Sequence, residues 1–138
     1  MHRHGYKGRK LGRERDQRRA LIKSLATSLV DHGKIETTLP KAKELSRYIE
    51  KVITKAKQGD LAGRRAVIAK LHTQAAANKL VDEIAPQLTK RTSGHVRVVR
   101  TRVRVGDGAQ LAEISFVDEL KAAPKQAPAA EPKRKEEK

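Results

Sequence analysis

The sequence predicts an α+β fold in which about four helices pack on a small mixed sheet, formed by one strand and a C-terminal hairpin. Three patterns predict it: an alternating segment before residue 40, a helical apolar stripe directly after it, and a second alternating region that turns at GDGA. Both ends of the chain offer few side chains that could enter a core. We therefore expect an extended basic N-terminal arm at residues 1–16, a single domain at 17–120 and a disordered low-complexity tail at 121–138.

The predicted strand and the central helix lie within residues 34–60. Ile35 and Leu39 belong to a period-two segment that is typical of a strand. Pro40 then changes the pattern, because proline is tolerated in the first turn of a helix and holds Leu39 in an extended conformation. The helix that follows has an apolar stripe made of Ala42, Leu45, Ile49, Val52, Ile53 and Ala56.

Capping residues and apolar spacing indicate three further helices. The first runs from about Asp16 to Gly33, and the central helix stops at Gly59. Asp60 and Thr73 can cap two more helices, of which the second reaches about residue 84. Their expected core side chains are Leu21, Ile22, Leu25, Ala26, Leu29 and Val30 in the first helix and Leu80, Val81, Ile84 and Leu88 around the last.

The C-terminal hairpin follows Pro86, which breaks or restarts the last helix. Valine alternates with arginine in HVRVVRTRVRV, and QLAEISFV returns with Ala112, Ile114 and Phe116 on one side. The alternation changes phase, which a bulge near Val98–Val99 would accommodate. Four arginines either face RNA or form a solvated face paired with acidic neighbours such as Glu113: Arg97, Arg100, Arg102 and Arg104.

Composition limits the class of partner. The 138 residues carry a formal net charge of +16, which favours a polyanion, and counterion release makes nucleic acid the natural one. The absence of cysteine excludes disulfides and thiolate chemistry. No window approaches the roughly 20 apolar residues of a membrane span, and no apolar segment typical of a secretory signal follows the start. We therefore expect no membrane partner, while the redox compartment stays undetermined.

The first 19 residues are the most densely basic part, with eight basic and two acidic side chains. Such a segment is either a solvated tail or an arm that orders on RNA, and its charge density favours the arm. Arginine and lysine would contact phosphates, while tyrosine or histidine would stack on bases. With the basic faces of the helices and a basic turn, the predicted RNA-binding residues are Arg3, His4, Tyr6, Lys7, Arg9, Lys10, Arg13, Arg15, Arg18, Arg19, Lys41, Lys43, Arg47, Arg64, Arg65, Lys90 and Arg91.

Two stretches carry a family resemblance. One is RHGYKGRKLGR at residues 3–13, and the other contains Ile35, Thr37–Thr38, Lys41-Ala42-Lys43, Glu50 and Val52-Ile53-Thr54. Together they resemble the bacterial large-subunit ribosomal protein seventeen family, and the similarity continues weakly to about residue 118. The resemblance implies an α+β fold with a small mixed sheet, contacts with large-subunit ribosomal RNA and neighbouring ribosomal proteins, and a place near the polypeptide exit region.

Other functions have less support in the sequence. No acid–base pair stands out, and no P-loop, zinc spacing or nucleophile elbow is present, so we expect no catalysis, cofactor, metal or small-molecule substrate. Glu44 and Glu50 look like helix-face partners of neighbouring lysines. A DNA-binding helix-turn-helix at 60–85 has less support, because its best candidate recognition helix, 74–84, offers Lys79 as its only basic side chain for reading bases. The sequence therefore predicts a structural ribosomal protein that binds RNA through phosphates.

Overall fold

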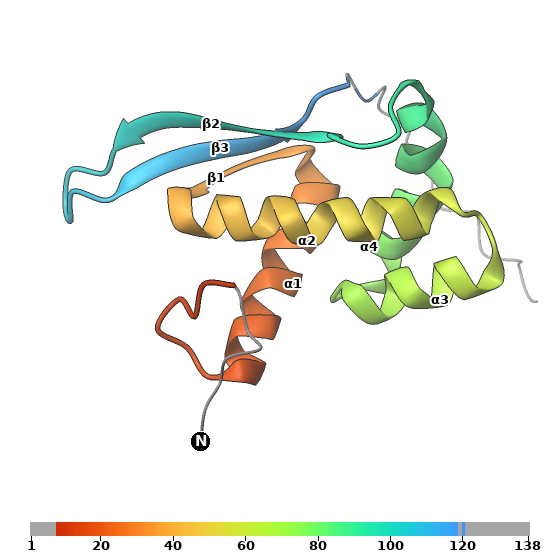
Figure 1. Ribbon diagram of the computed structural model, residues 1–138, viewed down its shortest axis with the longest axis horizontal. Coiled ribbons are helices and arrows are strands. Elements are labelled where there is room, and N and C mark those ends of the chain that lie inside the picture. Colours follow the sequence, from red (N-terminus) through yellow and green to blue (C-terminus); the bar gives the residue numbers. More distant parts are fainter. Residues whose placement is uncertain (1–7, 119, 121–138) are drawn as a thin grey trace, which may run out of the picture.

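The computed structural model describes residues 8–118 and residue 120 (Figure 1). It confirms the predicted fold class, with four α-helices and a three-stranded sheet in this part of the chain. Predictions for Arg3, His4, Tyr6 and Lys7 and for the 121–138 tail concern residues outside it. The elements are α1 (Arg15–His32), β1 (Lys34–Thr38), α2 (Leu39–Lys57), α3 (Leu61–Lys70), α4 (Gln74–Asn78), η1 (Lys79–Ile84), η2 (Ala85–Lys90), β2 (Val96–Val103) and β3 (Gln110–Phe116).

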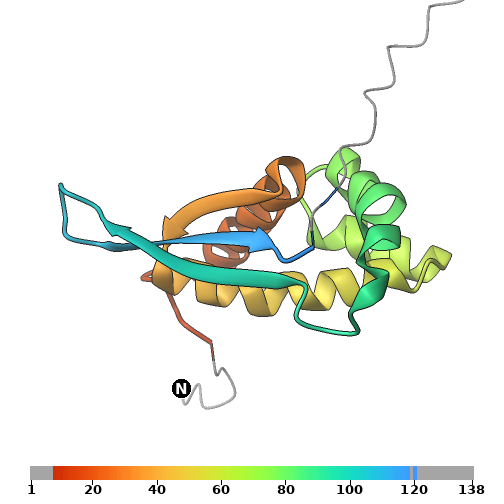
Figure 2. The ribbon, with the colours of Figure 1, turned by 90° about the horizontal axis from the view of Figure 1, so that it is seen from above.

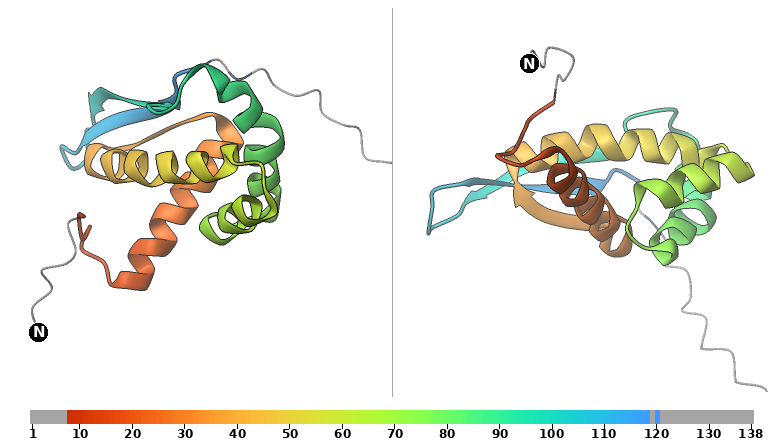
Figure 3. Two further views of the ribbon diagram at one scale, coloured as in Figure 1. Left: turned by 45° about the vertical axis from the view of Figure 1, so that its right-hand side comes forward. Right: turned by 90° about the horizontal axis from the view of Figure 1, so that it is seen from below.

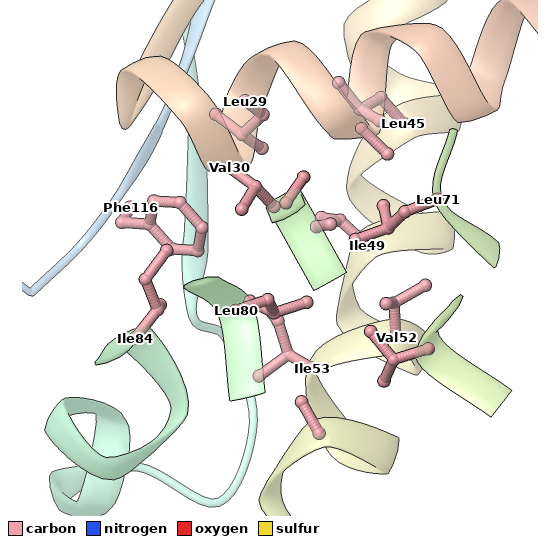
Figure 4. Packing of buried hydrophobic residues seen from close by; sticks show 14 of the residues in the cluster. Leu29, Val30, Leu45, Ile49, Val52, Ile53, Leu71, Leu80, Ile84 and Phe116 are labelled. Atoms are coloured by element: carbon pink, nitrogen blue, oxygen red, sulfur yellow. The ribbon is translucent and has the colours of Figure 1, made fainter. Parts of the chain in front are cut away.

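Helix α2 lies between the sheet and the other helices (Figures 1 and 3). It begins one residue earlier than predicted, at Leu39, with Pro40 in its first turn. All six residues of its predicted apolar stripe are buried. Figure 4 shows Ile49 and Ile53 among core side chains from α1, η1 and β3, including Leu29, Leu80 and Phe116. The helical period of α2 therefore builds the centre of the core.

The sheet is antiparallel throughout, with strand order β1-β3-β2, so the mixed arrangement expected from the sequence is wrong. The strand β1 pairs with β3 rather than with β2, and only pairing with β2 would have made a parallel ladder. This order places Ile114, which is fully buried, opposite both Ile35 and Val98. The most apolar strand thus takes the central position over α2.

The hairpin changes register later than predicted. Val98 and Val99 pair with β3 without interruption, and the shift lies between Arg100 and Val103. Val98 faces the core, whereas Val99 and Val103 are 49% and 55% exposed. Seen from above, the strands lie in front of the helices and the hairpin end projects past them (Figure 2). The valines at odd positions, from Val99 onward, are therefore exposed where the hairpin leaves the core. The predicted bulge at Val98–Val99 is wrong.

The described part of the N-terminal arm is folded back rather than extended. Leu11 and Gly12 both have positive φ, at 56° and 62°, and Arg13 N donates to Lys10 O at 3.2 Å. A left-handed conformation is costly for leucine, and packing of the Leu11 side chain against the core offsets that cost. The prediction of a fully extended arm is therefore wrong for residues 8–14.

The predicted helix after Thr73 is split into three pieces. Thr73 Oγ1 accepts from Ala76 N at 3.3 Å, as expected of a cap, but regular α-helix ends at Asn78. The segment η1 is a π-helical turn, and Ala85 N bonds Leu80 O at its end. Pro86 explains the change, because its ring would clash with the carbonyl of residue 82 in a regular helix. A 3₁₀ segment, η2, continues to Lys90.

A buried polar cluster ties α2 to the loop before β2. His95 is fully buried, and its Nδ1 lies 2.8 Å from Glu50 Oε2. Glu50 Oε1 accepts from the backbone N–H groups of His95 and Val96 at 2.7 and 3.1 Å. Lys57 Nζ donates to Leu88 O at 2.8 Å and lies 3.3 Å from His95 Nε2. Glu50 is therefore an anchor of this loop, and its assignment as a partner of helix-face lysines is wrong.

The corner between α2 and α3 has room only for glycine at position 63. Asp60 Oδ1 caps α3 by accepting from Gly63 N at 2.7 Å, as predicted for Asp60. A Cβ on residue 63 would lie 2.6 Å from both Asp60 Oδ1 and Lys55 O. The capping side chain of Asp60 and the carbonyl of Lys55 near the end of α2 therefore both pack directly against this residue.

We expect Gly63→Ala to reduce the free energy of unfolding by roughly 1–3 kcal/mol, because the added methyl overpacks the corner. This loss should occur although alanine has the better helix propensity, by about 1 kcal/mol. Gly106→Ala is the control, since its Cβ position is open. Urea unfolding of both variants measures the difference, and equal stabilities would contradict the close approach at Gly63.

We expect Glu50→Ala to cost roughly 1–3 kcal/mol, because two buried N–H groups and the His95 ring lose their acceptor. Glu50→Gln keeps an oxygen acceptor at the same length and should cost less. Hydrogen exchange should accelerate at the amides of residues 95 and 96 in the alanine variant alone. Unchanged protection there would show that the cluster does not hold the loop.

Candidate nucleic-acid interface

The strongest candidate for anion binding is a groove of about 1350 Å³ on the side of α2 that carries Arg47 and Lys51. It is bounded by residues 8–15, the first turns of α1, the middle of α2 and the end of α3. Among its lining residues, two are acidic, Glu14 and Glu44. Nine are basic: Lys10, Arg13, Arg15, Arg18, Arg19, Lys23, Arg47, Lys51 and Lys70.

The first wall of the groove is the start of α1 with the folded turn before it. Arg15, Arg19 and Lys23 follow at i, i+4 and i+8, which places them along one helix face. The turn at Leu11 brings Arg13 alongside, and its guanidinium donates to Leu11 O at 3.1 Å. The unpaired N–H groups at a helix N-terminus also attract anions. This wall therefore places basic side chains beside the N-terminus of α1.

Cations near this helix start oppose the helix dipole. Glu14 is the N-cap residue but makes no side-chain cap bond. Arg19 lies 3.9 Å from Asp16 in a largely exposed ion pair, which contributes little. The charge arrangement is thus unfavourable for α1 alone, and an anion in the groove would relieve it.

The second wall comes from α2 and α3. Arg47 and Lys51 are one turn apart on α2, opposite its buried stripe. Tyr48 lies between them in sequence, and its hydroxyl donates to Lys70 O at 2.7 Å. Burial raises the pKa of Tyr48, so the hydroxyl remains a donor at neutral pH. This bond fixes the end of α3, and with it Lys70, against α2.

The structure brings only part of the predicted site together. Lys10, Arg13, Arg15, Arg18, Arg19 and Arg47 line the groove, whereas Arg9, Lys41, Lys43, Arg65 and Lys90 lie outside its lining. The predicted RNA-binding residues did not include Lys23, Lys51 or Lys70, although the first two lie on basic helix faces. The i+4 spacing from Arg19 and Arg47 could have indicated the first two. Lys70 could not be found this way, because only the packing of α3 on α2 places it there.

Two of the predicted arginines are engaged within the protein. Arg64 forms a bidentate ion pair with Asp82 and also bonds Asn78 Oδ1 at 3.2 Å. This hydrogen bonding lowers the pKa of Asp82. Arg91 Nε lies 3.5 Å from Asp118 Oδ1. Both contacts join separate segments, so a structural role accounts for these guanidinium groups.

The hairpin arginines are only partly paired. Arg104 binds Asp107 through two hydrogen bonds, which lower the pKa of that carboxyl to about 2. Arg102 bonds Glu36 Oε2 at 3.3 Å, and a shorter bond from Thr101 is the larger cause of the lowered pKa of Glu36. These pairs resemble a solvated strand face. Arg97 and Arg100 are exposed, which leaves both of their predicted roles open.

The structure does not contain the recognition helix that a helix-turn-helix at 60–85 would need. The helix α4 has five residues, Gln74–Asn78. Lys79, the one base assigned to recognition, donates to Asp31 O at 2.7 Å. It therefore satisfies a carbonyl at the end of α1.

Within 8–118, no group of three metal-ligating His, Cys, Asp or Glu side chains occurs. None of the helices described combines the length and apolarity needed to cross a lipid bilayer.

The family model and the relatives that match this chain carry the same family name. The family model described as Ribosomal protein L17 matches residues 21–117. The large ribosomal subunit protein bL17 of Campylobacter lari is 53% identical over 116 residues, covering 84% of this chain and 97% of the relative. The proteins of the same name from Campylobacter concisus and Sulfurimonas denitrificans are each 52% identical, over 86% and 84% of this chain and 98% of each relative.

Proposed function

The chain belongs to the ribosomal protein L17 family, and on this basis we propose that it is a structural constituent of the large ribosomal subunit in the bacterial cytoplasm. It binds and stabilises large-subunit ribosomal RNA through phosphate contacts, near the polypeptide exit region, beside neighbouring ribosomal proteins. It has no catalytic role, in keeping with the structural role of the family.

The observation that carries the RNA-binding part is the charge of the groove. Nine basic side chains from three helices and a turn converge on it, against two acidic ones. Phosphate binding needs cation density rather than side-chain pairs at base-reading spacing. The groove offers this density on a rigid support, because α2 is fixed in the core by its buried stripe.

The predicted residues outside the groove extend this proposal. Lys41 and Lys43 lie on the first turns of α2, and Arg65 lies on α3. Lys90 ends η2, directly before the loop that Glu50 anchors. These cations would contact phosphates flanking the RNA held in the groove. The predicted RNA contacts of Arg3, His4, Tyr6 and Lys7 concern residues outside the described part of the chain.

We expect the triple change Arg19→Ala, Lys23→Ala and Lys51→Ala to flatten the log–log salt dependence of RNA binding by roughly 2–3 units, because each lost phosphate contact removes about 0.7–0.9 units. Fluorescence anisotropy with a labelled fragment of large-subunit RNA, at several salt concentrations, measures the slope.

The control removes the same charge elsewhere, with Lys34→Ala, Lys55→Ala and Lys79→Ala, none of which lines the groove. This control should leave most of the slope intact. Equal flattening by both triple variants would show that binding follows net charge and not the groove.

A further inference from the structure

The groove differs from a simple basic patch, because its cations stand on two facing walls with apolar groups between them. Arg19 and Lys23 lie on the α1 wall, and Lys51 and Lys70 lie on the other. Ile22, Tyr48 and Ala69 line the same hollow. Tyr48 is half-buried and packs against the core, with its hydroxyl held by Lys70 O at 2.7 Å. The ring is therefore fixed in place within the lining of the groove.

An unpaired nucleotide matches this arrangement and a base pair does not. A single strand offers phosphates to cations on either side and exposes an apolar base face that can stack on an aromatic ring. In a duplex the base faces are covered by their neighbours, so no base face is free to stack on an aromatic side chain. A duplex would contact the rims and leave Tyr48 without a partner.

We propose that the groove binds an unpaired segment of RNA, such as a bulge or a loop, with phosphates between the α1 and α2 walls and a base stacked on Tyr48. This inference rests on the proposed RNA-binding function and specifies the kind of RNA that the groove accepts. It makes Tyr48 a contact residue, in addition to its hydrogen bond with Lys70 O.

Intrinsic fluorescence tests the stacking directly. The chain has two tyrosines and no tryptophan, so Tyr6→Phe leaves Tyr48 as the only fluorophore of this kind. Titration with a single-stranded RNA should quench its emission, after correction for absorption by the RNA. A duplex of the same length should bind without comparable quenching. Equal quenching by both RNAs, or by neither, overturns the stacking.

Affinity provides the second measurement. Tyr48→Leu should weaken single-strand binding by roughly 5- to 150-fold, the range for loss of one base–aromatic stack. The change should leave duplex binding nearly unaltered. Tyr48→Phe keeps the ring and should bind single strands nearly as the unaltered protein does, although it loses the bond to Lys70 O.

The outcomes separate the two proposals. Equally tight binding of duplex and single strand, lost from both in the Arg19, Lys23 and Lys51 variant, would overturn the single-strand inference and leave RNA binding by the groove intact. Binding of either RNA that survives this variant unchanged would overturn the groove itself. A preference for single strands that requires the ring at position 48 supports the inference.

Discussion

The whole structure depends on the two faces of α2. Its apolar stripe is buried between the sheet and the other helices (Figure 1). The same helical period that turns Ile49 and Ile53 inward turns Arg47 and Lys51 outward. Core and groove are thus two consequences of one periodicity. A shift of the stripe by one residue would disturb the packing and the charge density together.

Stability and binding make opposite demands on this protein. The groove gathers like charges at close range and places several against the positive end of a helix dipole, which weakens the isolated fold. Compensation comes from elsewhere: the buried stripe, the Glu50–His95 cluster and the Asp60 cap. Bound phosphates would turn the groove's charges from a destabilising into a stabilising contribution to the free energy of folding. The local conflict is therefore what a binding surface should show.

Sequence patterns predicted those features that depend on neighbours in the chain. The period of α2, the glycine stops at 33 and 59 and the caps at Asp60 and Thr73 are all local. Long-range features were missed. His95 gave no signal, because its partner Glu50 lies on another element. Likewise, nothing near Lys70 in the sequence shows that Tyr48 will bond its carbonyl and bring its side chain into the same groove as Arg19. The position of the register shift in the hairpin depends on where the helices end beneath it, which is also a long-range feature.

The strand order has a consequence for the time course of folding. The central strand, β3, is the last strand of the described chain, and β1 pairs with it from Lys34↔Ser115 to Thr38↔Leu111. During synthesis β1 emerges early and then has no partner until almost the entire domain has followed. Such distant pairing closes a long loop, which slows folding relative to a helical bundle of the same size. Until β3 arrives, α2 lacks the sheet that covers its apolar face, so a nascent chain with complete helices would still expose the centre of its core.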